Sequence, residues 1–453
     1  MRRSVPFIAV MALAMLMSLS AAQSDAEEVA GLPLHVQLID PAAVRVWIGD
    51  TLSSTATVAF ATRDGIVVVD TLGIPKADAA LRKVIARELG RADFKVLINT
   101  HEHGDHTGGN SVYADCTIVG HELVAEGMAS RPADRERMTA WYSRRFTELE
   151  ANLAKLPPDS PEAKRAAEEL VHARLNHEVF TSAAAPVVPT LTFSDRLSLS
   201  MGDTTFELYS IGGMHSASDI AVLVPERGIL LTGDTMADRW LTDTPGCLAS
   251  FMARPGVRHD FPRWLANWDL ILAQKDRIKL LLPGHWNGEL SLAGAEARVA
   301  YVRELWDGLH KAVQAGQSMA EVQSAYRLET RFATLAGSPG FSARNHASTL
   351  TEVWKIAANQ ESAAVRLAAL IDEGAPEAAI REVVAERDKK VAKYYFSENE
   401  INGHGYDFLG RDQVDKAIAV FKLNVELYPE SWNVYDSLGE ALLRSGDVVA
   451  AAG

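Results

Sequence analysis

The residues best suited to chemistry are concentrated in one short stretch, "NTHEHGDHTGG", at residues 99–109. Three histidines and an aspartate, namely His101, His103, Asp105 and His106, fall within six positions. Imidazole and carboxylate groups together are typical ligands of zinc and similar divalent ions. Four ligands so close in sequence do not fit one tetrahedral ion without strain. The spacing therefore predicts two adjacent ions.

Two ions need further ligands, and candidates recur where other apolar stretches end. His215 follows "ELYSIGGM", Asp234 follows "ILLTG" and His285 follows "IKLLLPG". Each comes after a glycine or a glycine-containing turn. Because side chains at the ends of several strands can project from one edge of the sheets, these three residues are predicted to complete the site.

The elements that must position these residues form two blocks of alternating strands and helices, residues 44–120 and 190–288. In the first block, stretches rich in β-branched residues ("VRVWI", "TATVAFA") predict antiparallel strands, and residues 76–89 have helical spacing. The stretch "FKVLIN" predicts the strand that leads into the histidines. Two such blocks predict two sheets packed face to face with helices outside.

A long, charged segment at residues 125–176 separates the two blocks. Its pattern is helical, interrupted by Pro157, Pro158 and Pro161. We expect it to be an insertion that forms a lid or a dimer contact beside the metal site.

Residues 291–453 are predicted to be almost entirely helical. From Glu398, two frames match the 34-residue tetratricopeptide spacing; the second begins at Trp432 and is incomplete at Gly453. A generic helical hairpin is the alternative. Because such repeats bury their faces by stacking, we expect an open apolar surface at this end, or a truncated chain. The helical regions are candidates for binding a protein partner.

The N-terminus and the charge indicate where the protein acts and on what. Residues 1–22 contain two arginines, an apolar stretch and then small residues, which predicts a cleaved signal peptide, a secreted or periplasmic location and no membrane span. Removing them leaves 43 of the 45 basic residues against 59 acidic ones. This acidity disfavours nucleic acid as a partner and favours a small-molecule substrate. Pairing of Cys116 with Cys247 is left open.

Residues 35–290 resemble the metallo-β-lactamase superfamily in the segments "THEHGDHTGG", "GGMHSASD", "LLTGDT" and "LLPGHW". The resemblance implies an α/β fold, a four-layer αββα sandwich, followed here by an α-helical C-terminal region. It also implies a ligand assignment, in which His101, His103 and His215 hold the first ion, Asp105, His106 and His285 hold the second, and Asp234 bridges both.

The resemblance further implies a binuclear metal-dependent hydrolase. A water shared by two zinc ions is expected to lose a proton near neutral pH, and the hydroxide can attack a carbonyl carbon. Asp105 is the candidate for orienting that water and moving protons. Asp234 favours an ester, thioester or lactone, since true zinc β-lactamases usually carry cysteine or serine there. Zinc is the expected ion, and iron or manganese would also suit these ligands.

Further residues are assigned by context. Asp70 and Asp219 are predicted to hydrogen-bond a ligand histidine, with turn capping as the alternative for Asp70. Trp141, Tyr142 and Trp286 are candidates for lining a substrate pocket, with core packing as the alternative for Trp286. Seven histidines are expected to have surface or core roles: His121, His172, His177, His259, His310, His346 and His404.

Three other functions remain open at this point. Two use the same metal site: β-lactam hydrolysis and alkyl sulfatase-like activity. The third is a partner-binding tetratricopeptide protein whose metal site is vestigial.

Overall fold

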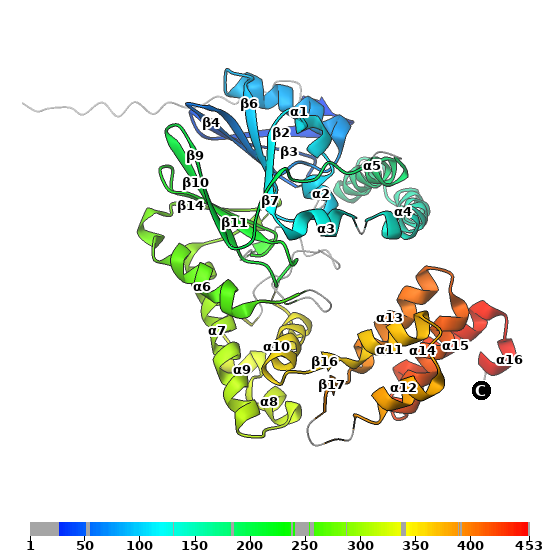
Figure 1. Cartoon of the computed structure of the whole chain (residues 1–453). Helices are drawn as coiled ribbons and strands as arrows, with labels where there is room; N and C mark the ends of the chain where they lie inside the picture. The colour runs from blue at the N-terminus through cyan, green and yellow to red at the C-terminus, as the bar shows by residue number, and fades with distance from the viewer. Residues whose placement is uncertain are drawn as a thin grey trace, which may run out of the picture.

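The computed structural model describes residues 27–50, 55–129, 131–182, 185–236, 239–240, 258–286, 288–336, 341–387 and 392–451, together with Ala253 and Lys389. The predicted signal segment and Cys247 lie outside these residues; Cys116 is a buried thiol and is free among the cysteines described. Figure 1 shows a strand-rich unit at the N-terminal side and a helical unit at the C-terminal end. Of the described helices, none is both long and apolar enough to cross a membrane.

The first sheet contains eight strands in chain order: β1 (Glu28–Val29), β2 (Leu32–Asp40), β3 (Ala43–Ile48), β4 (Thr57–Thr62), β5 (Gly65–Val69), β6 (Phe94–Ile98), β7 (Thr117–His121) and β8 (Leu191–Phe193). The pairs from β1 to β5 are antiparallel, as predicted for the first block. The pairs from β5 to β8 are parallel, with Val69 opposite Ile98. The carboxyl ends of β5 and β6 therefore meet at one edge.

The second sheet contains five strands, in the spatial order β14 (Leu280–Pro283), β12 (Ile229–Gly233), β11 (Ile220–Val224), β10 (Thr204–Ser210) and β9 (Arg196–Met201). β12 and β14 are parallel, and the other pairs are antiparallel. The carboxyl ends of β12 and β14 thus lie together. A small extra sheet joins β13 (Arg239–Trp240) to β15 (Gly288–Glu289).

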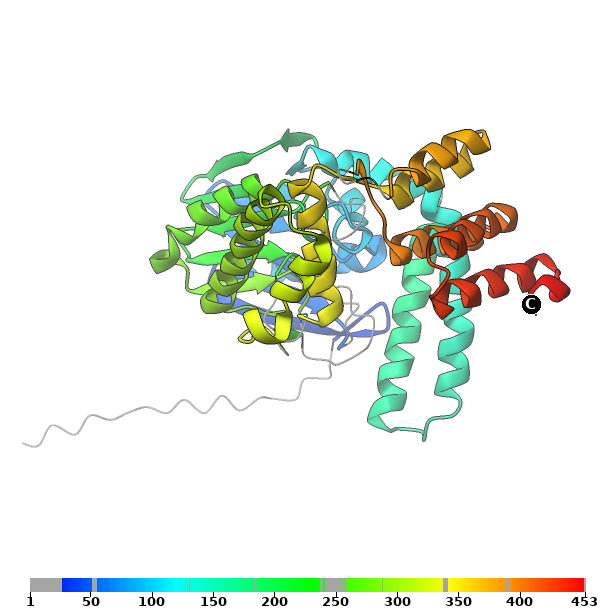
Figure 2. The ribbon, with the colours of Figure 1, turned by 90° about the horizontal axis from the view of Figure 1, so that it is seen from below.

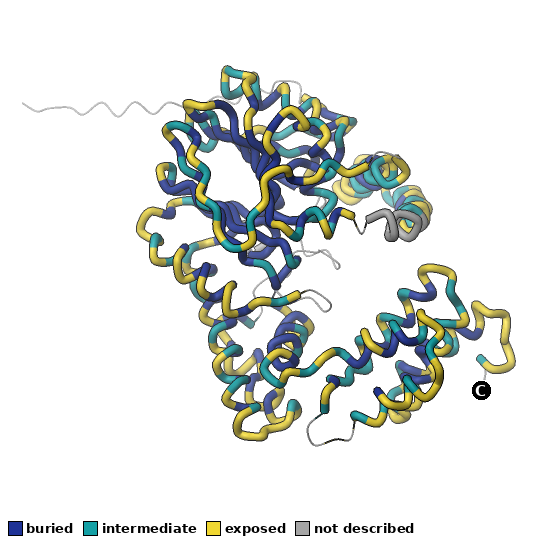
Figure 3. Tube along the Cα trace, viewed as in Figure 1, coloured by how far each residue is buried: buried dark blue, intermediate teal, exposed yellow. Residues whose placement is uncertain are grey.

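The two sheets pack face to face and helices cover their outer faces. The layer between the sheets contains Phe60 and Phe206, whose rings meet edge to face at 5.4 Å. On the outside of the first sheet, α1 (Pro75–Glu88) buries Leu81. On the outside of the second, α6 (Phe261–Leu272) buries Trp264. The predicted four-layer αββα fold is confirmed, and Figure 3 shows burial concentrated in these sheets.

Helices of different lengths connect β6 to β7 and β7 to β8 in the first sheet. They include α2 (Gly104–Thr107), the 3-10 turn η1 (Asn110–Tyr113), α3 (Leu123–Ala129), α4 (Arg131–Leu153) and α5 (Pro161–Thr181). The long helices α4 and α5 form an antiparallel pair that projects from the sandwich (Figure 2). The predicted interruption at Pro157 and Pro158 is confirmed, since they lie between α4 and α5. The prediction for Pro161 was wrong: this residue begins α5, because proline fits the first turn and Ser160 Oγ accepts from the Ala163 amide.

The 3-10 turn η2 (Lys275–Arg277) lies between α6 and β14.

The helices that follow residue 290 belong to two cores. The first four are α7 (Leu292–Gln314), α8 (Met319–Ala325), α9 (Leu328–Arg331) and α10 (Ala343–Ala357). Val299 of α7 and Leu350 of α10 share one apolar core with Leu230 of β12. The first part of the predicted helical region is therefore continuous with the outer face of the second sheet.

The C-terminal helical unit has its own core. It contains α11 (Ala363–Asp372), α12 (Glu377–Val384), α13 (Glu398–Gly410), α14 (Val414–Leu427), α15 (Trp432–Ser445) and α16 (Val448–Ala451), with a short parallel pair β16 (Glu361–Ser362) and β17 (Tyr394–Tyr395). Helices begin at Glu398 and Trp432, the first positions of both predicted frames. Gly405 lies against the Phe421 ring. The assignment to tetratricopeptide repeats stays a prediction.

Candidate metal centre

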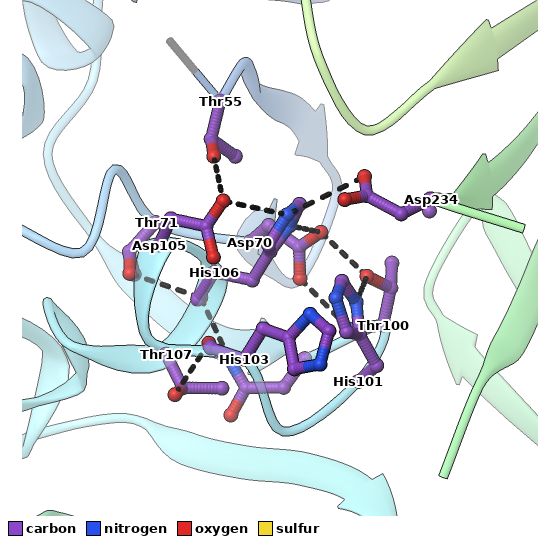
Figure 4. A network of polar contacts seen from close by, with 12 residues as sticks. Thr55, Asp70, Thr71, Thr100, His101, His103, Asp105, His106, Thr107 and Asp234 are labelled. Carbon is purple, nitrogen blue, oxygen red and sulfur yellow. Dashed lines mark hydrogen bonds and ion pairs between the residues drawn. The ribbon is translucent and has the colours of Figure 1, made fainter. Parts of the chain in front are cut away.

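The residues predicted to bind metal lie at one edge of the two sheets, where four strands end. His101, His103, Asp105 and His106 follow β6, and Asp105 and His106 lie in α2. His215 lies in the turn between β10 and β11, Asp234 follows β12, and His285 follows β14. Figure 4 shows the side chains from the first segment gathered beside Asp234.

The seven side chains form two adjacent groups. His101, His103 and His215 make one group, and Asp105, His106, Asp234 and His285 make the other. Within each group the ligand atoms lie within 4.8 Å of one another. Residues far apart in sequence are thus brought close enough to share an ion.

Asp234 connects the two groups. Its Oδ2 lies 3.6 Å from His215 Nε2 and 3.1 Å from His285 Nε2, and its Oδ1 lies 3.4 Å from His106 Nε2. A carboxylate within reach of imidazoles from both groups can contact two ions at once. This is the position that the sequence resemblance implied for Asp234.

The donor atoms suit divalent ions, and His101 shows this most clearly. Nε2 of His101 is fully buried and has no hydrogen-bond partner among the described residues, although it points among three other imidazoles. A buried polar atom without a partner is costly. Burial, with the nearby rings, holds the pKa of His101 well below its usual range, so the neutral ring keeps a lone pair for a cation. The two groups therefore support binding of divalent metal ions.

Charges in the second group are strongly interdependent. Burial lowers the pKa of His285, but Asp234 and Asp105 outweigh this effect and raise the pKa to about 9. Burial raises the pKa of Asp234, yet His285 and His106 hold the net pKa well below its usual range. Protons on these histidines balance the carboxylates, and a divalent cation would replace those protons.

Asp70 supports the ligand histidines, as predicted. Its Oδ2 lies 2.9 Å from His106 Nδ1 and accepts a 2.7 Å bond from Thr100 Oγ1, and its Oδ1 accepts a 2.7 Å bond from the Thr100 amide. The carboxylate therefore holds a ligand ring and also caps the turn after β6. The two interpretations of Asp70 are both confirmed.

Asp219 acts differently from our prediction. Its carboxylate accepts hydrogen bonds from the backbone amides of His215 (3.0 Å) and Ser216 (2.7 Å) and from Ser216 Oγ (2.8 Å). It holds the turn that presents His215, not the imidazole ring. The difference arises because the turn folds back, with the Ile211 amide bonded to the Asp219 carbonyl at 2.8 Å.

Several supporting residues were not anticipated. Arg45 is buried and donates to the carbonyl of His285 at 2.8 Å. Thr55 Oγ1 donates to Asp105 Oδ2 at 3.4 Å. Ser218 Oγ accepts from the Glu102 amide at 3.1 Å, which ties the first histidine segment to the His215 turn. A signal existed only for Arg45, a single charge within an apolar strand.

The predicted pocket residues separate into two surroundings. Trp286 stacks on Trp47 at 5.9 Å, which is packing against the first sheet. Tyr142 of α4 is half-buried, stacks on Phe180 at 5.6 Å, and lies within electrostatic range of Asp105. Burial and that negative charge raise its pKa. Trp141 is 45% exposed. Tyr142 packs in the α4–α5 pair and stays a candidate for lining the substrate pocket.

The histidines assigned to other roles lie outside the two groups. His121 bonds the Ser194 carbonyl at 3.0 Å, and His346 bonds Tyr301 Oη at 2.9 Å. Both are buried structural residues. The side chain of His259 is only 3% exposed, and it contacts Gly213 in the turn that carries His215.

Comparison with known proteins places these features in a family. Residues 49–285 match the metallo-beta-lactamase superfamily, which is just over half of the chain. Over 98 residues the chain is 34% identical to the 2,4-dinitroanisole O-demethylase subunit alpha of Nocardioides sp. (strain JS1661), covering 21% of this chain and 29% of that protein. The chain thus spans less than a third of that relative.

The solved structures that match the chain share little sequence with it. A metallo-beta-lactamase from Pontibacter korlensis has a TM-score of 0.38 and 18% identity, covering 59% of this chain and 99% of its own. A double mutant of the sec-alkyl sulfatase PisA1 has a TM-score of 0.49 and 13% identity, covering 93% and 64%. The stereoselective inverting sec-alkylsulfatase Pisa1 from Pseudomonas sp. has a TM-score of 0.48 and 14% identity, covering 92% and 63%.

Proposed function

Because the chain belongs to the metallo-beta-lactamase superfamily and is a hydrolase of that superfamily, we propose that it hydrolyses an ester, thioester or lactone with the help of two divalent ions. The observation that carries the proposal is the pair of ligand groups that share Asp234. The residues proposed to hold the ions are His101, His103, Asp105, His106, His215, Asp234 and His285.

The chain's own residues then have distinct tasks. When bound, the ions would lower the pKa of a water molecule and polarise the substrate oxygen. Asp105 is the carboxylate of the second group that is most open to solvent, with 35% of its side chain exposed. It can therefore accept a proton from a water at the mouth of the site. Thr55 donates to its Oδ2 and orients it.

The aspartate at position 234 favours an ester, thioester or lactone as the substrate over a β-lactam. In the superfamily, thioesterase-like and lactonase-like members carry aspartate here. Cephalosporin hydrolysis is a weaker candidate for that reason, and alkyl sulfate hydrolysis remains an alternative. Cleavage of an activated aryl ether is a further candidate, because the Nocardioides relative is named for demethylating 2,4-dinitroanisole.

One experiment separates these candidates. The purified full chain is assayed for metal content, then for turnover of a chromogenic ester, a thioester, a lactone, a cephalosporin, an alkyl sulfate and 2,4-dinitroanisole. We expect two ions per chain, fastest turnover of an ester, thioester or lactone, loss of activity with a chelator and recovery with Zn²⁺, Fe²⁺ or Mn²⁺. The ion that restores most activity identifies the preferred metal.

A variant tests the role of Asp105 directly. Asp105→Asn keeps the shape but removes the proton acceptor, and kcat is expected to fall about 10²- to 10⁴-fold. Asp115→Asn, which changes a solvent-exposed aspartate paired with Arg82, is the control and should keep wild-type kcat. Fewer than one ion per chain and no turnover in the panel would instead favour the partner-binding alternative.

We also propose that the protein acts after export. The support is the pattern of residues 1–22, with basic, apolar and small residues in that order. N-terminal sequencing of the protein from fractionated cells should place the first residue of the mature chain near Gln23. A full-length N-terminus in the cytoplasmic fraction would contradict export.

A further inference from the structure

The turn that presents His215 is held from outside by His259. Gly213 in this turn has a positive φ of 114°, and a Cβ there would lie 3.1 Å from His259 Cα. His259 Nδ1 donates a hydrogen bond to the Gly213 carbonyl. His259 itself directly precedes Asp260, the N-cap of α6. The ring is therefore fixed by a helix start while it contacts the His215 turn.

A line of buried ionisable side chains continues from His259 into the helices. His259 Nε2 lies 3.5 Å from Glu352 Oε2 on α10, and Glu352 Oε1 lies 2.7 Å from Lys355 Nζ. Lys355 Nζ also lies 3.2 Å from Glu400 Oε1 on α13, in the C-terminal helical unit. The four side chains are 3%, 6%, 8% and 13% exposed in this order. Such buried charges are stable only when each has its partner.

α10 also contacts Ala253 through two side chains. Thr349 Oγ1 accepts from the Ala253 amide at 3.0 Å, and Ser348 Oγ donates to the Ala253 carbonyl at 2.8 Å. At the other end of the line, Ser362 Oγ donates to Glu400 at 2.5 Å. One helix, α10, thus contacts His259 beside the His215 turn and also contacts the C-terminal unit.

We propose that His259 and Glu352 are positioning residues for His215, and that Lys355 and Glu400 join this contact to the C-terminal helical unit. A metal site binds tightly when its ligands are held in place before the ion arrives. Replacing Glu352 removes the carboxylate that faces His259 Nε2 and one of the two carboxylates around Lys355, so the Gly213 carbonyl and the His215 turn lose support. The helical unit therefore helps to set the affinity of the group formed by His101, His103 and His215. The inference rests on the proposed function only in requiring that ions bind there.

The test measures metal binding and backbone exchange, not activity. Metal-free full chain is titrated with Co²⁺, whose visible absorption reports ligand geometry. Glu352→Gln is expected to weaken one of two Co²⁺ sites about 2- to 30-fold and to change its spectrum. Glu400→Gln should act in the same direction with a smaller effect. In the metal-free variants, residues 211–219 should exchange amide hydrogens faster than in wild type.

His346→Gln is the matched control on the same helix. His346 is buried and bonds Tyr301 and the Tyr326 carbonyl. Its replacement should lower thermal stability but leave Co²⁺ affinity, spectrum and exchange of residues 211–219 unchanged.

Two results would overturn the inference. One is a Glu352→Gln protein with wild-type Co²⁺ affinity and exchange; the other is an equal loss in Glu352→Gln and His346→Gln, which would indicate general loosening of α10. If Glu352→Gln does not fold, Lys355→Met is measured in the same way and judged by the same two results. A wild-type chain that binds no Co²⁺ would contradict the proposed function itself, while the exchange measurement would still decide on the positioning role.

Discussion

At the scale of single residues, Asp70 fixes which nitrogen atom each of two histidines presents to the site. The Thr100 hydroxyl has one proton, which it donates to Asp70, so at 3.1 Å it can only accept from His101 Nδ1. His106 Nδ1 donates to Asp70 directly. Both rings therefore turn Nε2 towards the centre of the site. One carboxylate sets the tautomer of a histidine in each ligand group.

Two variants separate the direct contact of Asp70 with His106 from its contact with His101 through Thr100. Asp70→Asn should weaken both metal sites about 10- to 100-fold, because neither ring is held in its tautomer. Thr100→Val keeps the shape but removes the hydroxyl, so only the group with His101 should weaken. Competition with a chromophoric chelator for Zn²⁺ measures both. Equal, unchanged affinities in the two variants would refute the role of Asp70.

The candidate metal ligands could be predicted from the sequence, but the residues that support them could not. The seven ligand candidates lie in segments where histidine, aspartate and glycine are concentrated, so their types and spacing were sufficient to name them. Thr100, Arg45 and Ser218 have ordinary types in ordinary positions. Arg45 contacts His285 across a separation of 240 residues, and only the folded chain brings them together. Asp219 was placed correctly near His215, but its partner depended on how the turn folds.

At the scale of elements, α1 carries a buried acid, Asp78, whose carboxylate holds the turn between β5 and α1. Asp78 is fully buried and accepts bonds from the Leu72 amide (2.7 Å) and the Ile74 amide (3.0 Å). Burial raises its pKa from 3.8 to about 7, although these bonds oppose the shift. Between those values the folded chain keeps a proton that the unfolded chain releases.

Stability should therefore fall as pH rises from about 4 to about 7. One proton difference corresponds to at most about 1.4 kcal/mol per pH unit. Asp78→Asn should flatten this part of the curve, although it also weakens one backbone bond. Urea unfolding at several pH values compares the two proteins. Parallel curves would show that Asp78 titrates normally.

Tyr142 is the residue through which we expect the α4–α5 pair to reach the proposed site. If it lines the substrate pocket, Tyr142→Ala should raise KM about tenfold, the loss expected for one modest apolar contact, with bound metal unchanged. Phe146→Ala is the control, because Phe146 packs in the hairpin with Leu149 and Leu170. Steady-state kinetics on the best substrate measures both. A KM change of equal size in both variants would indicate a loosened helix pair instead.

Strands and long helices were predicted well because their apolar patterns are local. The expected strand at residues 94–99 and helix at residues 76–89 match β6 and α1 to within one residue. The start of α5 was missed, since the same proline can end a helix or begin one, and Ser160 decides which. The shared core of α7, α10 and the second sheet depends on contacts between distant segments, which periodicity does not encode.

At the scale of the whole molecule, the sandwich and the C-terminal helical unit have separate apolar cores, so we expect a change in one to destabilise mainly that unit. A Cβ at position 405 would overlap the Phe421 ring, so Gly405→Ala should destabilise the C-terminal helical unit by about 1–3 kcal/mol. Removing metal should instead destabilise the sandwich, by about 2.7 kcal/mol for each site if free ion stands at 100 times its Kd.

Calorimetry with and without chelator distinguishes these effects. We expect chelation to shift the transition of the sandwich and Gly405→Ala to shift that of the helical unit. A Gly439→Ala variant is the matched control, because a Cβ there has only ordinary contact, 3.8 Å from the Ala451 carbonyl. A single transition that moves equally under both changes would mean that the two units unfold as one.

The order of the ligands along the chain has a consequence for biogenesis. His101 is the first and His285 the last, and His285 reaches the site only when β14 has paired with β12. A growing chain that ends before this strand would not complete the proposed ligand set. If these residues hold two ions as proposed, metal uptake would be a late event that reports completion of both sheets.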